Sequence, residues 1–420
     1  MYAWLRELFP IYRSLTGNGT RQTLAYIRNL FPQLTLHEVP SGTSCFDWNV
    51  PEEWNVRDAF VADEQGRKII DFQQHNLHLM GYSIPKDEVV DLDELQNHLH
   101  SLEEQPDAIP YVTSYYSREW GFCLPHRQRQ RLQPGKYRVF IDSTLQPGHL
   151  TFGEAILPGK EAGEILFSTY VCHPCMANNE LSGLVVATAL ARWIAALPDR
   201  RFTYRFLFLP ETIGSIYYLS RNLTHLKRHL LAGFIVTCVG DDRTYSYLAS
   251  RSGQTLADRV ARHVLTHHTP GFQTYSFLER GSDERQYCSV GADLPVASIM
   301  RSKYNTYPEY HTSFDDLSLV SPQGLGGSLD ILQRVVETLE LNRFYRTTCI
   351  CEPQLGKRGM YPNISTSKTF AQVRTMRNVI AYADGTMDLI GLADRIGAST
   401  AEVIPIIRKL AEAGLLEIIP

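Results

Sequence analysis

The chain has 420 residues and a formal net charge of -4; 44% of its residues are hydrophobic and 20% are charged. This length exceeds a single simple core and predicts two or three domains of a globular protein. The acidic balance argues against a surface that wraps nucleic acid, and the sequence has neither a signal-peptide pattern nor an apolar run long enough to span a bilayer.

Two helices are predicted in residues 1–34, where apolar residues recur at helical spacing on both sides of a Gly-Asn-Gly turn. Residues 46–145 are instead rich in aromatics, Val, Thr and turn residues, which predicts a small β-rich domain. Within it, residues 87–110 predict a helix that ends at Pro106. The aromatic side chains here fit the core of that domain, or less commonly a lid that stacks on a sugar ring: Trp48, Trp54, Tyr111, Tyr115, Tyr116, Trp120 and Phe122.

From residue 163 the pattern alternates between strands and helices. Strands are predicted at 164–171, 203–210, 232–240 and 294–300, and helices at 181–197 and 214–230. This alternation indicates an α/β fold with a doubly wound sheet covered by helices on both faces. Polar residues directly follow three strands, namely His173, Glu211, and Asp241 with Asp242. Because ligands collect at the carboxyl ends of such strands, we expect the functional site there.

The last segment predicts a separate helical unit that resembles a winged helix-turn-helix. Ser399 and Glu402 form a capping box that opens a helix, Gly414 closes it, and Pro405 is expected to kink or shorten it. Acidic residues outnumber basic ones after residue 373, so we expect a packing or oligomerisation module and no DNA reader. The expected domains are 1–45 with 146–345, the insert at 46–145, and the winged helix at 346–420.

Two cysteine pairs raise the question of thiol chemistry. Cys172 and Cys175 form a C-x-x-C motif, but the only other close pair is Cys349 and Cys351, without matched knuckle spacing. A redox dithiol normally opens a helix, whereas Pro174 lies inside this motif. We therefore expect Cys172 and Cys175 to be packing residues. Eight unevenly placed cysteines favour reduced thiols in a cytoplasmic protein.

A histidine and acid set is the stronger candidate site. His173 follows a buried strand, Glu180 precedes a helix, and His311 comes from a much later loop. Two histidines and one carboxylate from separate loops, with an open position for water, match a catalytic zinc shell. Glu211 would then be the general base. A strand-end histidine such as His173 also often has a purely structural role.

Four motifs carry a resemblance to a known family: "HP…NNELSG", "PETIGS", "GSDERQYC" and "YHTSFDD". They resemble the bacterial leucyl-aminopeptidase-type zinc exopeptidase clan, most closely an aminopeptidase-like subfamily with an inserted small domain and a C-terminal winged helix. The resemblance covers nearly the whole chain. It implies a doubly wound mixed sheet of the zinc exopeptidase type, and metal ligation by His173 and His311.

The chain departs from the clan pattern at its carboxylates. Asn179 stands at the bridging Asp position with Glu180 one place further on, while Thr212 and Thr237 stand where two more acids are implied. The acid implied at Thr237 is absent unless Asp241 or Asp242 substitutes for it. Because two adjacent metals need extra anionic ligands, we expect one zinc ion, held by His173, Glu180 and His311, with a second ion disfavoured.

The expected function is a zinc-dependent amide-bond hydrolase, foremost an aminopeptidase, acting on a peptide or an amide-containing small molecule. Asp283 is expected to bind a substrate amine and Arg285 a substrate carboxylate, although the pair also fits a structural ion-pair loop. Two alternatives stay open: an amidase or deacylase of a modified sugar or peptide-like metabolite, and a non-catalytic scaffold or regulator. A homo-oligomer through the insert or the C-terminal domain is a further option.

Overall fold

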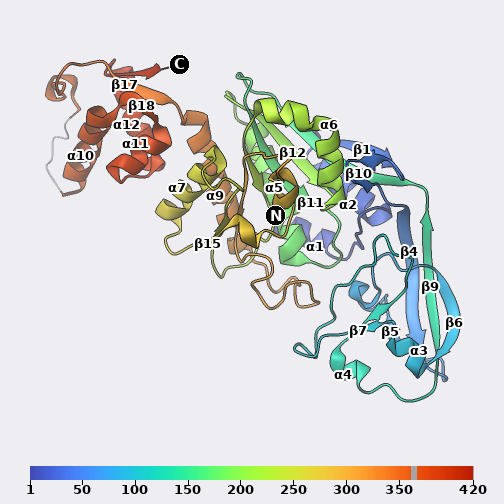
Figure 1. Ribbon diagram of the computed structural model, residues 1–420. Coiled ribbons are helices and arrows are strands. Elements are labelled where there is room, and N and C mark those ends of the chain that lie inside the picture. The colour runs from blue at the N-terminus through green and yellow to red at the C-terminus, as the bar shows by residue number, and fades with distance from the viewer. Residues whose placement is uncertain (361–366, 420) are drawn as a thin grey trace.

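An eight-stranded mixed sheet forms the centre of the computed structural model, which describes residues 1–360 and 367–419 (Figure 1). The central strands are parallel, and antiparallel pairs occur toward both edges. The strand order is β1 (Thr35–Pro40), β10 (His149–Leu157), β12 (Thr203–Leu209), β11 (Glu164–Tyr170), β13 (Leu230–Ile235), β16 (Val296–Met300), β14 (Ser246–Leu248) and β15 (Gln273–Tyr275). The predicted strands are all present, although β13 ends at Ile235, five residues before the predicted end.

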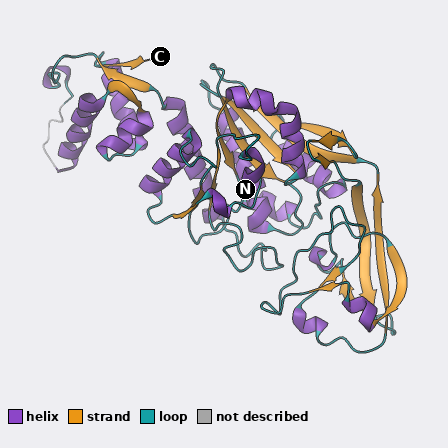
Figure 2. Ribbon diagram, viewed as in Figure 1, coloured by secondary structure: helices purple, strands orange, loops and turns teal. Residues whose placement is uncertain are grey.

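Successive side chains of the central strands pack against opposite helical layers, as the period of two in a strand requires. In β11, Phe167 joins the larger apolar cluster and Leu166 joins the other. The larger cluster includes helices α1 (Tyr2–Leu8), α2 (Asn18–Leu30), α5 (Ser182–Ala195), α7 (Leu256–His268) and α9 (Pro322–Leu341). The second includes α6 (Ile213–His229) and α8 (Glu284–Tyr287). The predicted sheet with helices on both faces is confirmed (Figure 2).

The insert is built on a four-stranded antiparallel sheet in the order β5 (Lys68–Asp71), β4 (Glu53–Ala62), β9 (Lys136–Gln146) and β6 (Lys86–Asp91). Its smaller elements are β2 (Ser44–Cys45), β3 (Trp48–Asn49), η1 (Asn76–His78), α3 (Leu92–Gln96), β7 (Leu99–His100), β8 (Phe122–Cys123) and α4 (His126–Arg129). The predicted helix end at Pro106 is wrong: α3 ends at Gln96, because the chain then pairs β7 with β8.

The C-terminal unit has a separate apolar core and the expected winged-helix form. Its sheet runs in the order β18 (Asp384–Asp388), β17 (Phe344–Thr347), β19 (Leu416–Ile419), and its helices are η4 (Gly356–Arg358), α10 (Ser367–Tyr382), α11 (Leu389–Ile396) and α12 (Thr400–Glu412). The capping box of Ser399 and Glu402 is confirmed, and Gly414 has the left-handed φ of 68° expected after a helix. Pro405 lies inside α12 and does not end it.

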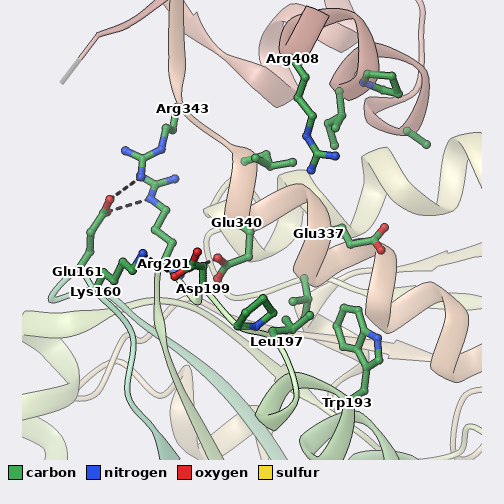
Figure 3. A pocket seen from close by; sticks show the side chains of 16 residues that line it. Lys160, Glu161, Trp193, Leu197, Asp199, Arg201, Glu337, Glu340, Arg343 and Arg408 are labelled. Atoms are coloured by element: carbon green, nitrogen blue, oxygen red, sulfur yellow. Dashed lines mark hydrogen bonds and ion pairs between the residues drawn. The ribbon is translucent and has the colours of Figure 1, made fainter. Parts of the chain in front are cut away.

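Polar contacts and the buried Ile390 of α11, which joins the larger apolar cluster, attach the winged helix to the central domain. Nδ1 of His263 on α7 lies 2.6 Å from Oδ1 of Asp394, and Nη2 of Arg259 lies 2.5 Å from Oδ1 of Asp388. Between α12, α9 and the loop after α5 lies a cleft of about 710 Å³, into which Arg408 of α12 extends (Figure 3). The face of α12 that carries Ile404 and Arg408 is thus turned toward the central domain. Within the described ranges, every helix is too short or too polar to cross a bilayer.

Candidate metal centre and active site

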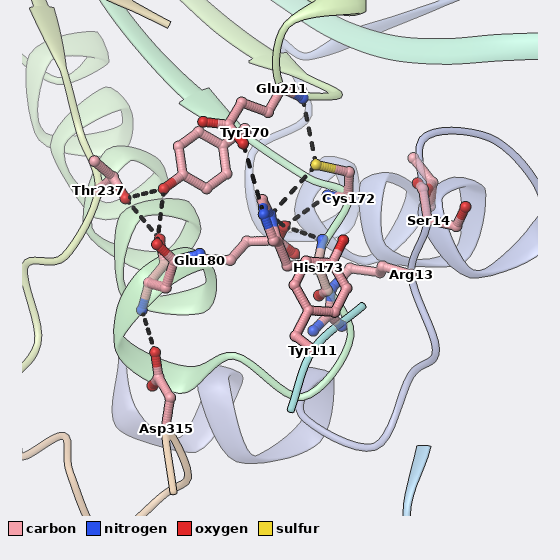
Figure 4. Close-up of polar contacts among 12 residues, drawn as sticks. Arg13, Ser14, Tyr111, Tyr170, Cys172, His173, Glu180, Glu211, Thr237 and Asp315 are labelled. Atoms are coloured by element: carbon pink, nitrogen blue, oxygen red, sulfur yellow. Dashed lines mark hydrogen bonds and ion pairs between the residues drawn. The ribbon is translucent and has the colours of Figure 1, made fainter. Parts of the chain in front are cut away.

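His173 lies just after β11, and its imidazole is held by a buried carboxylate (Figure 4). Nδ1 of His173 lies 3.1 Å from Oε2 of Glu180, and the same oxygen accepts the backbone N–H groups of Cys172 and His173. Oε1 of Glu180 accepts a hydrogen bond of 2.6 Å from Nε of the fully buried Arg13. Glu180 therefore lies beside His173, as predicted, but with both oxygens engaged, and Nε2 is the histidine nitrogen left for a ligand.

The turn that carries Glu180 is fixed by a second acid. Glu180 belongs to η2 (Ala177–Leu181), a π-helical turn that leads into α5. Asp315 accepts the backbone N–H of Asn178 at 2.6 Å and that of Asn179 at 3.0 Å, so its two oxygens satisfy the start of this turn. Burial raises the pKa of Asp315 to about 7. π turns of this kind are frequent at functional sites.

His311 reaches the same position from the loop after β16. The centroids of the His173 and His311 rings are 5.4 Å apart. Nε2 of His311 is buried and has no hydrogen-bond partner among residues 1–360 and 367–419. Burial and the neighbouring His173 lower the pKa of His311 to about 3, so the ring is neutral and can donate a lone pair. An unpaired polar atom is costly inside a protein, and a metal ligand role would satisfy it.

Glu211 brings a carboxylate to these histidines from the end of β12. Its Oε2 lies 3.6 Å from Nε2 of His173, and its side chain keeps 20% of its surface exposed. Burial raises the pKa of Glu211. Its backbone N–H points to Sγ of Cys172 at 3.3 Å. Cys172 is buried, as expected of a packing residue, yet it also contacts both His173 and the Glu211 loop.

Asp283 and Arg285 contact the residue that follows Glu211. Oδ1 of Asp283 accepts the backbone N–H of Thr212 at 2.8 Å and the hydroxyl of Ser215 at 2.9 Å. Its Oδ2 is buried and unpartnered within the part of the chain that the structure describes. Burial, then the charge of Glu211, raises the pKa of Asp283 to about 7. Nη2 of the exposed Arg285 lies 2.6 Å from Oγ1 of Thr212, so both predicted residues border the site.

A neutral network occupies two positions at which the resemblance implies carboxylates. The hydroxyl of Tyr170 lies 3.1 Å from Oδ1 of Asn179 and 2.5 Å from Oγ1 of Thr237. Oγ1 of Thr237 also donates to the backbone carbonyl of Asn179 at 2.6 Å. All three side chains are buried, and their contacts with one another are between neutral groups.

Asp241 and Asp242 have other contacts. The carboxylate of Asp241 accepts hydrogen bonds from the backbone and side chain of Ser302, the backbone of Arg243 and the amide of Asn178. It therefore ties together three loops. The side chain of Asp242 is 55% exposed.

Sequence reasoning missed three residues of this site. Arg13 comes from the N-terminal segment, where nothing in the local pattern predicts a buried arginine. Tyr170 lies inside a strand that was interpreted only as a buried strand. Tyr111, from the insert, lies with its ring centroid 5.2 Å from that of His173 and 5.1 Å from that of His311. Tyr111 is one of the aromatic residues for which the sequence allows two roles, in the core of the insert or in a lid.

Comparisons with known proteins agree with this architecture. A family model described as a "Domain of unknown function (DUF4910)" matches residues 2–342, and a winged helix-turn-helix model matches residues 343–418. A Clostridium acetobutylicum protein described as a "Putative polysaccharide biosynthesis protein with aminopeptidase-like domain" is 44% identical over 399 residues, which cover 94% of this chain and 91% of that protein.

Solved structures give the same result for the fold. The crystal structure of a "putative peptidase" from Clostridium acetobutylicum superposes with a TM-score of 0.93 at 42% identity, covering 100% of this chain and 96% of that one. BSAP, a zinc aminopeptidase from Bacillus subtilis, has a TM-score of 0.57 at 14% identity, covering 80% of this chain and 94% of BSAP, and shows the fold alone. The chain belongs to the DUF4910 family, as an aminopeptidase-like protein of the zinc exopeptidase fold with a C-terminal winged helix.

Proposed function

We propose that this protein is a zinc-dependent amide-bond hydrolase that acts as an aminopeptidase. The observation that carries the proposal is the convergence of His173 and His311 beside Glu211, with Nε2 of His311 buried and unpartnered in the described chain. The three residues come from loops at the carboxyl ends of different strands, which is where this type of fold places its ligands.

The two imidazoles are donors of the kind that zinc binds, and the three-ligand shell of a catalytic zinc would need one further donor besides them. His173 and His311 would hold it through their Nε2 atoms, because Nδ1 of His173 faces Glu180. Glu180 would then act through His173 rather than as a direct ligand, as a carboxylate that fixes the tautomer and raises the basicity of the imidazole. A bound zinc would polarise the scissile carbonyl and lower the pKa of an attacking water.

Glu211 would take the proton of that water and pass it to the leaving amine. Its carboxylate lies beside Nε2 of His173, and its partial exposure leaves it open to solvent and substrate. Burial raises its pKa, and a carboxylate with a raised pKa is a stronger proton acceptor. The backbone that follows Glu211 is held in place, because Asp283 accepts a hydrogen bond from the N–H of Thr212.

The substrate class is an N-terminal amine next to an amide. Asp283 keeps one buried oxygen without a partner in the described residues, which suits a substrate ammonium group, and the exposed Arg285 lies on the same loop. An assay with an aminoacyl anilide and its N-acetylated form separates the candidate activities. Cleavage of the free-amine substrate alone supports an aminopeptidase, whereas equal or preferred cleavage of the acetylated form supports an amidase or deacylase.

A second candidate, a non-catalytic scaffold, is favoured by the network of Tyr170, Asn179 and Thr237. These neutral side chains stand where the resemblance implies anionic ligands, and two adjacent divalent ions would lack the charge that they need. The same network supports one zinc over two in the catalytic proposal. Metal content therefore separates the candidates: about one zinc per chain supports the hydrolase, and no zinc under replete conditions supports the scaffold.

Glu211→Gln tests the assigned base. We expect hydrolysis to fall at least about 100-fold, because the proton acceptor is lost, while the zinc content stays unchanged. Glu88→Gln, an exposed acid of the insert, is the matched control and should keep full activity. If Glu211→Gln loses its zinc together with its activity, Glu211 is a ligand; if it stays fully active, the base assignment is wrong.

A further inference from the structure

A segment of the insert is hydrogen-bonded to the loop that carries His311. The two run side by side, with one antiparallel bridge between Pro110 and Thr312. The backbone N–H of Tyr111 donates to the carbonyl of His311 at 2.9 Å. Three further contacts complete the pairing: Gln105 Nε2 to the Pro308 carbonyl at 2.8 Å, Ile109 N–H to Ser313 Oγ at 3.0 Å, and Ser313 N–H to the Ile109 carbonyl at 2.9 Å.

His311 needs such support because its backbone is strained. Its φ is 56°, in the left-handed region that a histidine seldom adopts. Residues in this conformation persist where surrounding structure over-determines them, and they cluster at functional sites. The segment 105–113 supplies that surrounding structure on the insert side, through backbone bonds at His311 and Ser313 and a side-chain bond to the Pro308 carbonyl.

The ring of Tyr111 contacts both candidate ligands. Its centroid lies 5.2 Å from that of His173, and it meets His311 edge-on at 5.1 Å with an interplanar angle of 84°. Edge-to-face geometry at this distance is favourable and restricts the orientation of both rings. A single side chain of the insert therefore touches the two histidines that the central domain provides.

Tyr111 is in turn fixed by the core of the insert. Its hydroxyl lies 3.0 Å from that of Tyr115, whose ring packs edge-on against Tyr82 at 5.8 Å. Tyr82 stacks on the buried Trp54 at 5.7 Å, and Trp54 donates its indole N–H to the carbonyl of Ser83. A series of contacting rings, from Trp54 through Tyr82 and Tyr115 to Tyr111, therefore connects the core of the insert with the two histidines.

We infer that the inserted domain helps to set the geometry of the proposed metal centre. Tyr111 is a positioning residue: it sets the spacing and orientation of the His173 and His311 rings, while the paired segment holds the His311 loop in its strained conformation. The inference rests on the proposed zinc site for its consequence, and on the contacts of the insert for its geometry.

The test compares Tyr111→Ala, Tyr111→Phe and Tyr116→Ala. Tyr116 is the matched control, since it lies in the same loop but is 51% exposed and packs on Trp48. Zinc affinity is measured by chelator competition, the ligand geometry by the visible spectrum of the Co²⁺ form, and the His311 loop by hydrogen exchange of residues 308–313 in metal-free protein.

We expect Tyr111→Ala to weaken zinc binding by about tenfold, as loss of an orienting partner typically does, and to shift the Co²⁺ spectrum. Exchange at 308–313 should rise. Tyr111→Phe should restore all three readouts, because it keeps the ring, and Tyr116→Ala should match the wild type. Unchanged affinity and exchange in Tyr111→Ala would overturn the inference.

Two further measurements keep the inference separate from the proposed function. If the wild type binds no zinc, the proposed function fails, but exchange at 308–313 still reports whether the insert holds the loop. If Tyr111→Ala does not fold, Ser313→Ala removes one pairing bond without touching the rings. It should raise exchange in the same loop, and unchanged exchange would contradict the inference.

Discussion

The insert and the winged helix are both additions to the central sheet, yet they join it in different ways. Trp54 and Ile141 of the insert belong to the same apolar cluster as Leu207 and Ile216 of the central domain. Most buried apolar residues of the winged helix form a cluster of their own; Ile390 of α11 joins the central cluster, and polar contacts to α7 and α9 lie beside a large cleft. The insert is therefore continuous with the domain that carries the site, whereas the winged helix is an attached unit.

This difference separates two roles for an accessory domain. A shared core couples the insert to the sheet energetically, so that its segment 105–113 can support the loop of His311. The main cluster of the winged helix is built from other residues than those of the site, and only Ile390 of α11 joins the central cluster.

The largest effect is expected from a substitution in the apolar cluster that the insert and the central domain share. Trp54→Ala should lower the free energy of unfolding of the central domain by about 3–5 kcal/mol, because it leaves a cavity in the apolar cluster that the insert and the central domain share. The change in the free energy of unfolding is measured by urea titration, with fluorescence and zinc affinity as the two readouts. Leu410→Ala, equally buried but in the winged-helix cluster, should destabilise only the winged helix and leave zinc binding unchanged. Loss of zinc affinity in Leu410→Ala would show that the two cores are not independent.

A smaller effect is expected at the junction of the winged helix. Asp394→Ala removes the acceptor of the His263 ring, whose other nitrogen already accepts the backbone N–H of Thr400 at 3.0 Å. We expect docking of the winged helix to weaken by about 1 kcal/mol, with hydrolysis unaffected. Hydrogen exchange in α7 and α11 reports the docking. A fall in kcat/KM would mean that the winged helix reaches the site after all.

The smallest effect concerns the ion pair where the insert begins. Arg21 donates to Glu53 at 2.5 Å, and this bond lowers the pKa of Glu53 to about 2. A lowered pKa stabilises the folded state above the unfolded value, and the contribution is lost as pH falls from about 4.5 toward 2. Partial exposure keeps it below about 1 kcal/mol. Unfolding free energies of wild type and Glu53→Gln should converge across this range; parallel curves would contradict the assignment.

Local pattern was sufficient for much of the fold. The alternation of buried strands and helices predicted the doubly wound sheet, because burial on both faces imposes continuous apolar runs on parallel strands. Ser399 and Glu402 predicted the start of α12, since a capping box acts within one turn. The strand ends likewise predicted that His173 and Glu211 lie close together, and their facing atoms are 3.6 Å apart.

The contacts of the site depended on tertiary structure. Glu180 was expected to face the metal, but its partners are Arg13, far earlier in the chain, and two backbone N–H groups. Tyr111 reaches the histidines only because the insert folds back onto the loop of His311. The sequence by itself determined the elements and which strand ends carry polar groups, since those follow from periodicity and local hydrogen bonding. Only the tertiary structure decided which side chains meet, because long-range packing sets their partners.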